Sequence, residues 1–126
     1  MNIDVATEKA IRNFISRIAD TYSIAGVILY GSRARCTHRT DSYVDVALLL
    51  NGERKDFVDT KLAMADVAFE VMLETGLRIS PLPVWLIEWE HPEEYSDPQL
   101  LRNIELEGIR LRLYENDIGE IEKNHR

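Results

Sequence analysis

The sequence predicts an α+β fold in which a small mixed β-sheet is flanked by helices. Two continuous apolar runs, residues 24–30 and 43–50, have the composition of strands covered on both faces. Three other segments repeat apolar residues at helical spacing, and they are interleaved with the apolar runs. The expected order is helix, strand, strand, helix, strand, helix, strand, within one domain over residues 1–114 and a polar tail over residues 115–126.

The first half of the chain supplies a helix and two strands. A helix is expected over residues 5–22, because its apolar residues recur at three- and four-residue intervals: Ile11, Phe14, Ile15, Ile18, Ala19 and Tyr22. The run 24–30 then predicts a central strand that ends at Gly31. After a basic loop, the run 43–50 predicts a second strand, closed by the turn residues Asn51-Gly52.

The second half begins with the longest expected helix, over residues 54–75, with Gly76 as its C-terminal cap. Its apolar residues alternate at spacings of four and three: Val58, Leu62, Ala65, Phe69 and Met72. Residues 79–87 predict a third strand, and its two prolines indicate either an edge strand or one that starts late. Asp97-Pro98 then predicts a helix start, followed by a short closing strand over residues 109–114.

The composition of the chain indicates which kinds of partner and which cellular location to expect. The net charge of −7, from 22 acidic and 15 basic residues, disfavours a large nucleic-acid interface. The region between Gly31 and Asp41 is locally basic, which suits a small anion; its arginines are Arg33, Arg35 and Arg39. One cysteine, no apolar run of about 18 residues and no leader-like N-terminus lead us to expect a cytoplasmic protein without membrane spans.

Two features carry candidate chemistry. Gly31-Ser32 follows a buried strand directly, where a glycine lets the backbone approach a ligand and a serine can hold phosphate oxygens. Asp45 lies inside an apolar strand, where an ionised carboxylate is costly unless it is paired or binds a metal. A structural alternative remains open, in which Asp45 caps a loop or pairs with Arg33 or Arg35.

Together these residues resemble the DNA polymerase beta-type nucleotidyltransferases, and in particular the minimal nucleotidyltransferases (MNT) that accompany HEPN toxins. The family motif is Gly-Ser-x10-Asp-x-Asp; here Gly31-Ser32 is followed by ten residues and then Tyr43-Val44-Asp45. The resemblance implies a polymerase beta-like fold. It implies that Gly31, Ser32, Arg33 and Arg35 hold the triphosphate of ATP. It also implies that Asp45 binds Mg²⁺ together with the residue at position 43.

The sequence departs from the family pattern at the metal site. Tyr43 replaces the first motif aspartate, and a neutral phenol is a poor Mg²⁺ ligand. Asp41 is about 13 Å further along an extended strand, too far to share an ion with Asp45. A third family carboxylate is expected on the next strand, where Ser80 stands, and Glu88 is a possible substitute for it.

The resemblance implies a nucleotidyltransferase antitoxin that transfers AMP from ATP to a tyrosine of a cognate HEPN toxin, with which it forms a hetero-oligomer. The alternative is an inactive antitoxin that neutralises the toxin by binding alone. Transfer to a small molecule is a third reading, but the relatives that do this usually carry an added helical domain. The three histidines have no metal-ligand spacing, so a zinc site is not expected.

Overall fold

The chain folds around four strands: β1 (Ile24–Tyr30), β2 (Val44–Leu50), β3 (Ile79–Trp85) and β4 (Ile109–Leu111). A computed structural model describes residues 3–114, and the predicted polar tail over residues 115–126 lies outside them. The sheet order is β3-β2-β1-β4, with β2 and β3 parallel and the other two pairs antiparallel. The predicted mixed sheet is confirmed, and β3 with its two prolines is an edge strand as expected.

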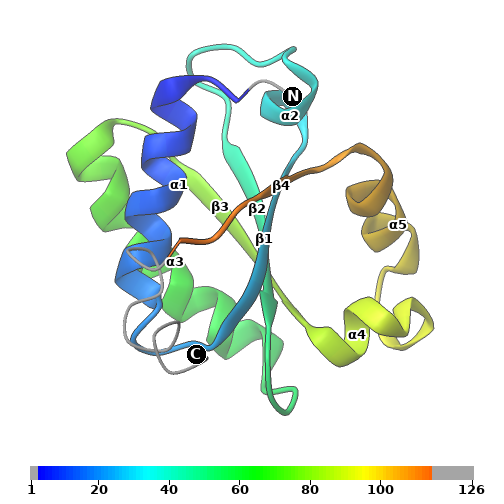
Figure 1. Cartoon of the computed structure of the whole chain (residues 1–126). Helices are drawn as coiled ribbons and strands as arrows, with labels where there is room; N and C mark the ends of the chain where they lie inside the picture. Colours follow the sequence, from blue (N-terminus) through cyan, green and yellow to red (C-terminus); the bar gives the residue numbers. More distant parts are fainter. Residues whose placement is uncertain (1–2, 115–126) are drawn as a thin grey trace.

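Helices cover both faces of this sheet (Figure 1). One face packs against α1 (Val5–Ile18) and α3 (Phe57–Thr75); the other packs against α4 (Leu86–Glu90), the 3₁₀-helix η1 (Pro92–Glu94) and α5 (Pro98–Glu107). The short helix α2 (Ser32–Arg35) follows β1 at one end of the sheet. β1 and β2 are therefore buried on both sides, which explains why they are continuous apolar runs. The predicted α+β class is confirmed.

Side-chain caps begin three of the helices. Asp4 accepts a hydrogen bond from the Thr7 backbone N–H of α1 at 2.7 Å, and Asp56 and Asp97 cap α3 and α5 in the same way. Gly76, at a φ of 80°, ends α3 as predicted. The first helix ends at Ile18, four residues earlier than expected, and β3 ends at Trp85 because α4 begins there.

The apolar stripe that predicted α3 does not face the sheet. This stripe, called here the α3 stripe, consists of Val58, Leu62, Ala65, Phe69 and Met72. Leu62 is 61% exposed and Phe69 is 56% exposed. The inward face of α3 is formed by a different set of side chains: Thr60, Met64, Ala68 and Val71. The helix is therefore apolar on two faces, of which the described chain covers one.

None of the helices within residues 3–114 is long and apolar enough to cross a membrane.

Candidate functional site

The two features singled out in the sequence, Gly31-Ser32 and Asp45, meet at one end of the sheet. Tyr30, the last residue of β1, pairs with Asp45 near the start of β2. Gly31 has a φ of 76° and a ψ of −157°, a backbone region that is essentially restricted to glycine. A Cβ at Gly31 would lie 2.4 Å from the Asp45 Oδ2 atom. Glycine is therefore required both by the turn and by the carboxylate packed against it.

The loop after Gly31 turns at once into the short helix α2. The backbone N–H groups of Ala34 and Arg35 donate to the Gly31 carbonyl at 3.1 and 3.2 Å. The helix ends at Cys36, which has a φ of 60° in the left-handed region where glycine is usual. A non-glycine residue is therefore held at a positive φ where the chain leaves α2.

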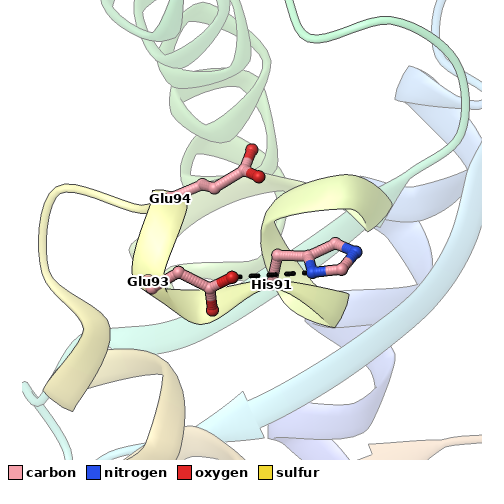
Figure 2. Close-up of side chains that lie close together, drawn as sticks. All are labelled: His91, Glu93 and Glu94. Carbon is pink, nitrogen blue, oxygen red and sulfur yellow. Dashed lines mark ion pairs between the residues drawn. The ribbon is translucent and has the colours of Figure 1, made fainter.

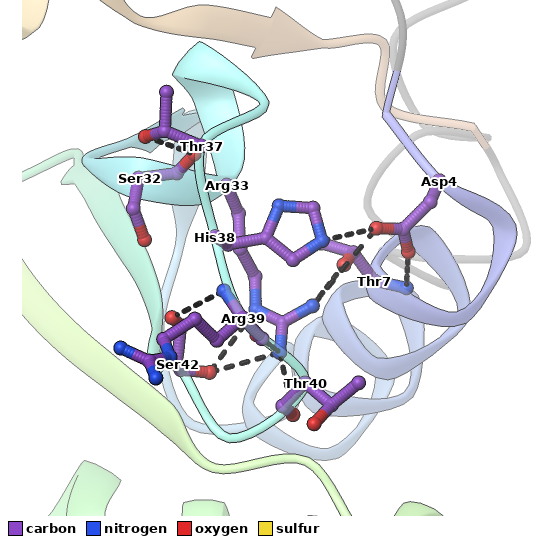
Figure 3. Close-up of polar contacts among 9 residues, drawn as sticks. All are labelled: Asp4, Thr7, Ser32, Arg33, Thr37, His38, Arg39, Thr40 and Ser42. Atoms are coloured by element: carbon purple, nitrogen blue, oxygen red, sulfur yellow. Dashed lines mark hydrogen bonds and ion pairs between the residues drawn. The ribbon is translucent and has the colours of Figure 1, made fainter.

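Arg33 is buried and holds the loop that joins β1 to β2 (Figure 3). Its guanidinium donates to the Ser42 carbonyl through Nε at 3.1 Å and Nη2 at 2.9 Å, and to the Thr40 carbonyl at 3.2 Å. Nη1 donates to the Thr7 Oγ1 atom at 2.9 Å, which ties the loop to α1. Because these donors are engaged inside the fold, Arg33 positions the loop instead of contacting a triphosphate directly, as the resemblance had implied.

Asp4 and His38 complete the same network. His38 Nε2 lies 3.0 Å from the Asp4 Oδ2 atom, and the Asp4 carboxylate also lies 3.9 Å from Arg33. Burial acts to raise the pKa of Asp4, but the Thr7 hydrogen bonds and the charges of His38 and Arg33 outweigh it, so the pKa is lowered overall. The His38 side chain is 23% exposed and lies against α1.

Asp45 is half-buried and has no hydrogen bond or ion pair with any residue in the described range 3–114. Burial raises the pKa of its carboxyl, and the charges of Arg35 and Lys61 act in the opposite direction. The structural alternative of an ion pair is not supported, because Arg33 is bound to loop carbonyls and Arg35 lies 3.5 Å from Glu107. A carboxylate in this state is available for a ligand or cation.

Lys61 is a site residue that the sequence did not indicate. It projects from α3, and its Nζ donates to the Pro81 carbonyl on β3 at 2.6 Å. Burial lowers the pKa of Lys61, and the charge of Asp45 acts to raise it. A cationic group therefore lies at the edge of the sheet near Asp45. Only the tertiary packing of α3 on β3 brings it there.

Tyr43 stands one residue before β2, which begins at Val44. Tyr43 is 53% exposed, and the Arg78 guanidinium lies 5.0 Å from the centroid of its ring. No hydrogen bond or ion pair joins Tyr43 to Asp45 within residues 3–114. The first motif position is thus occupied by a ring that packs beside Arg78.

The position expected for a third carboxylate is occupied by Ser80, which pairs with Asp45 across the parallel β2–β3 ladder. Glu88 does not replace it. Its Oε1 accepts from the Trp85 backbone N–H at 3.1 Å and its Oε2 lies 3.4 Å from Arg54, at the start of α4. That end of β3 is the end away from Ser80, so Glu88 is a helix-capping residue rather than part of the site.

A hollow of about 160 Å³ separates the Gly31 turn from α5. Tyr30, Gly31 and Arg35 line one side, and α5 contributes Asn103 and Glu107. Burial raises the pKa of the Tyr30 hydroxyl, with a further contribution from the Asp45 charge, so the phenol stays protonated at neutral pH. A ligand held at Gly31-Ser32 would meet these α5 side chains, which the sequence did not single out.

A second group of potential metal ligands lies elsewhere. His91, Glu93 and Glu94 offer ligand atoms within 4.8 Å of one another at the turn between α4 and η1 (Figure 2). All three are exposed, and His91 Nδ1 lies 3.6 Å from the Glu93 carboxylate. This turn follows β3, whose last residue pairs with Leu50, so the group lies at the opposite end of the sheet from Asp45.

Comparison with known proteins connects this arrangement to a family. A family model described as a nucleotidyltransferase domain matches residues 9–124, which includes the whole sheet and the Gly31–Asp45 end. No curated protein matches the sequence.

Proposed function

Because the chain belongs to the nucleotidyltransferase domain family, we propose that it is an MNT-type antitoxin that transfers AMP from ATP to a tyrosine of a cognate HEPN-type toxin. The observation that carries the proposal is the half-buried Asp45 carboxylate, which has no partner among the described residues and packs against Gly31. The MNT subtype and the partner come from the resemblance of the Gly31–Asp45 stretch. We place the reaction in the cytoplasm, where a chain with a single cysteine needs no disulfide.

The donor set fits one Mg²⁺ ion that is shared with a nucleotide. Mg²⁺ is commonly held by one or two carboxylates together with phosphate oxygens and water. Asp45 supplies one carboxylate, whereas Tyr43 and Ser80 stand where the family has the others. When bound, the ion would neutralise charge on the phosphates during transfer. A pair of protein-bound ions does not fit, because a second carboxylate is missing.

The remaining parts of the site bind and orient the nucleotide. Gly31-Ser32 would take the phosphates, and Arg35 is exposed enough to approach them. The reaction forms a bond between the partner's tyrosine oxygen and the α-phosphorus of ATP. The bond from that phosphorus to the β-phosphate oxygen breaks, pyrophosphate leaves, and the tyrosine proton passes to solvent. Arg33 acts indirectly by holding the loop from Arg39 to Ser42 in place.

A second candidate function is favoured by the missing carboxylates. With Tyr43 and Ser80 at family metal positions, the same fold would neutralise the toxin by contact alone. Loss of a carboxylate weakens the hold on a metal ion whose charge stabilises the transition state, so we expect AMP transfer to be slower by orders of magnitude. The two candidates therefore differ in a measurable quantity, the rate of AMP transfer, and agree on the partner.

The test uses Mg²⁺, ATP labelled on the α-phosphate, and the purified HEPN-type protein encoded beside this chain. Four versions are compared: wild type, Tyr43→Asp, Tyr43→Phe and Asp45→Asn. The transferase proposal expects labelling by wild type, faster labelling by Tyr43→Asp, an unchanged rate with Tyr43→Phe and loss with Asp45→Asn. Labelling by Tyr43→Asp alone would establish the contact-only candidate for the natural chain. If no version labels the partner, the transferase proposal fails.

A further inference from the structure

The outer side of α3 presents apolar side chains that the described part of the chain leaves uncovered. Leu62 and Phe69 of the α3 stripe are more than half exposed, and the adjoining Leu73 is 70% exposed. Single exposed apolar residues are ordinary, but a continuous set along about four turns of one helix is typical of an interaction surface. The domain does not need this face for its own core, because the inward face of α3 consists of other residues.

The spacing of the α3 stripe indicates the shape of its partner. Successive members are four, three, four and three residues apart, which keeps them in line with a second helix along a shared seam. A sheet edge or a loop would not match a repeat of 3.5 residues over this length. The stripe therefore suits a helix laid along α3.

A hollow in this face offers an anchor point. It has a volume of about 190 Å³, and the residues that line it include Tyr43, Ala65, Ala68, Phe69, Met72 and Arg78. Small residues flanked by large apolar ones accept an inserted side chain, and one such buried anchor commonly carries much of the binding free energy. The hollow is large enough for about one large apolar side chain of a partner.

Charges beside the α3 stripe indicate the sign of the charge that a partner would carry. Asp59 and Asp66 are seven residues apart, so they line the same edge of the stripe two turns from each other. Neither forms an ion pair within the described range 3–114. On the other edge, Lys61 donates to the Pro81 carbonyl and Arg78 packs on Tyr43. The Asp59–Asp66 edge of the stripe is therefore acidic, and the Lys61 and Arg78 edge is basic.

We propose that the α3 stripe is a docking surface for an amphipathic helix of a partner protein. The partner helix has apolar residues at alternating spacings of three and four, and lysine or arginine along the edge that meets Asp59 and Asp66. A second copy of this chain fits less well, because each copy carries a net charge of −7. An antiparallel pair would also bring the Asp59–Asp66 edge against itself. The proposal does not depend on nucleotide chemistry at Asp45.

The binding test uses two synthetic helical peptides about three heptads long, with leucine at both seam positions. One has lysine at the flanking positions and the other has glutamate there. The lysine peptide is expected to bind the wild-type protein, and Leu62→Glu or Phe69→Glu should weaken it by about tenfold or more. The matched control is Leu106→Glu, since Leu106 is 82% exposed on α5 and lies away from the stripe. Thermal melts of each variant establish that it folds.

Charge reversal gives the sharper comparison. An Asp59→Lys, Asp66→Lys double variant should lose affinity for the lysine peptide and gain affinity for the glutamate peptide, and added salt should weaken both complexes. Failure of the lysine peptide to bind, or equal losses with Leu62→Glu and Leu106→Glu, would overturn the proposal. A wild-type dimer in sedimentation that Leu62→Glu converts to monomer would assign the surface to a second copy and would also overturn it.

Discussion

Replacement of Gly31 by alanine should damage the site and the fold through two separable effects. The backbone at Gly31 lies in a region that is essentially restricted to glycine, and holding another residue there costs about 1–3 kcal/mol. For a domain of this size that cost corresponds to a fall in melting temperature of about 4–12 °C. The second effect is local, because the new Cβ would lie 2.4 Å from the Asp45 Oδ2 atom.

Relief of that contact requires the carboxylate to move. Ordinary contact begins at 3.4 Å, so the Oδ2 atom must retreat by 3.4 − 2.4 = 1.0 Å. A misplacement of this size at a reacting centre can cost about 10²-fold in activity. We therefore expect Gly31→Ala to weaken Mg²⁺-dependent ATP binding, measured by titration calorimetry, well beyond what its loss of stability explains.

The control is Gly52→Ala. Gly52 also has a positive φ, of 91°, but nothing lies within 4 Å of a Cβ placed there. It should lose stability through backbone strain and retain nucleotide binding. A Gly31→Ala, Asp45→Ala double variant should recover part of the stability lost by Gly31→Ala alone, because the clash is removed. Equal nucleotide affinity in Gly31→Ala and Gly52→Ala would refute the reasoning.

Three further predictions concern the carboxylates and the buried arginine. Burial raises the pKa of Asp45 above 3.8, so the fold favours the protonated carboxyl. This contribution to stability is fully present below about pH 3.8 and is lost as the pH rises through the folded pKa. Asp45→Asn should therefore melt at a higher temperature than wild type at neutral pH, and not in acid. The pKa of Asp4 is lowered, so the contribution of its carboxylate to stability is present above pH 3.8 and is lost as the pH falls through the folded pKa. Asp4→Ala should therefore lower the free energy of unfolding by about 1 kcal/mol at neutral pH in denaturant titrations, and by less in acid. Arg33→Lys should cost about 2–4 kcal/mol and speed amide exchange over residues 39–42, whereas the exposed Arg35→Lys should change stability by less than about 0.5 kcal/mol.

Much of the fold was predictable because the local sequence preferences for strands and turns agree with the tertiary structure. Continuous apolar runs identified β1 and β2, and the turn at Gly31 between them brought Tyr30 beside Asp45. The family resemblance places Ser80 at the position of a third carboxylate, and Ser80 pairs with Asp45 in the β2–β3 register. In these segments each residue's preference is satisfied by neighbours close in sequence or in the same sheet.

Other features depend on contacts that the sequence does not display. The basic loop resembled an anion site, but Arg33 is buried through a bond to Thr7, a residue 26 positions away. Lys61 reaches the site only because α3 packs along β3. The α3 stripe predicted the helix correctly but not which of its faces is buried, since α3 is apolar on two sides and periodicity alone does not distinguish them.

Calorimetric titration of ATP into the wild type and the Asp45→Asn variant, with and without Mg²⁺, tests most directly whether Asp45 and Gly31-Ser32 form a nucleotide site. Our account predicts that wild type binds ATP in the presence of Mg²⁺, that removal of Mg²⁺ weakens binding, and that Asp45→Asn removes this dependence on Mg²⁺. Equal ATP affinity in wild type and Asp45→Asn, unaffected by Mg²⁺, would contradict it.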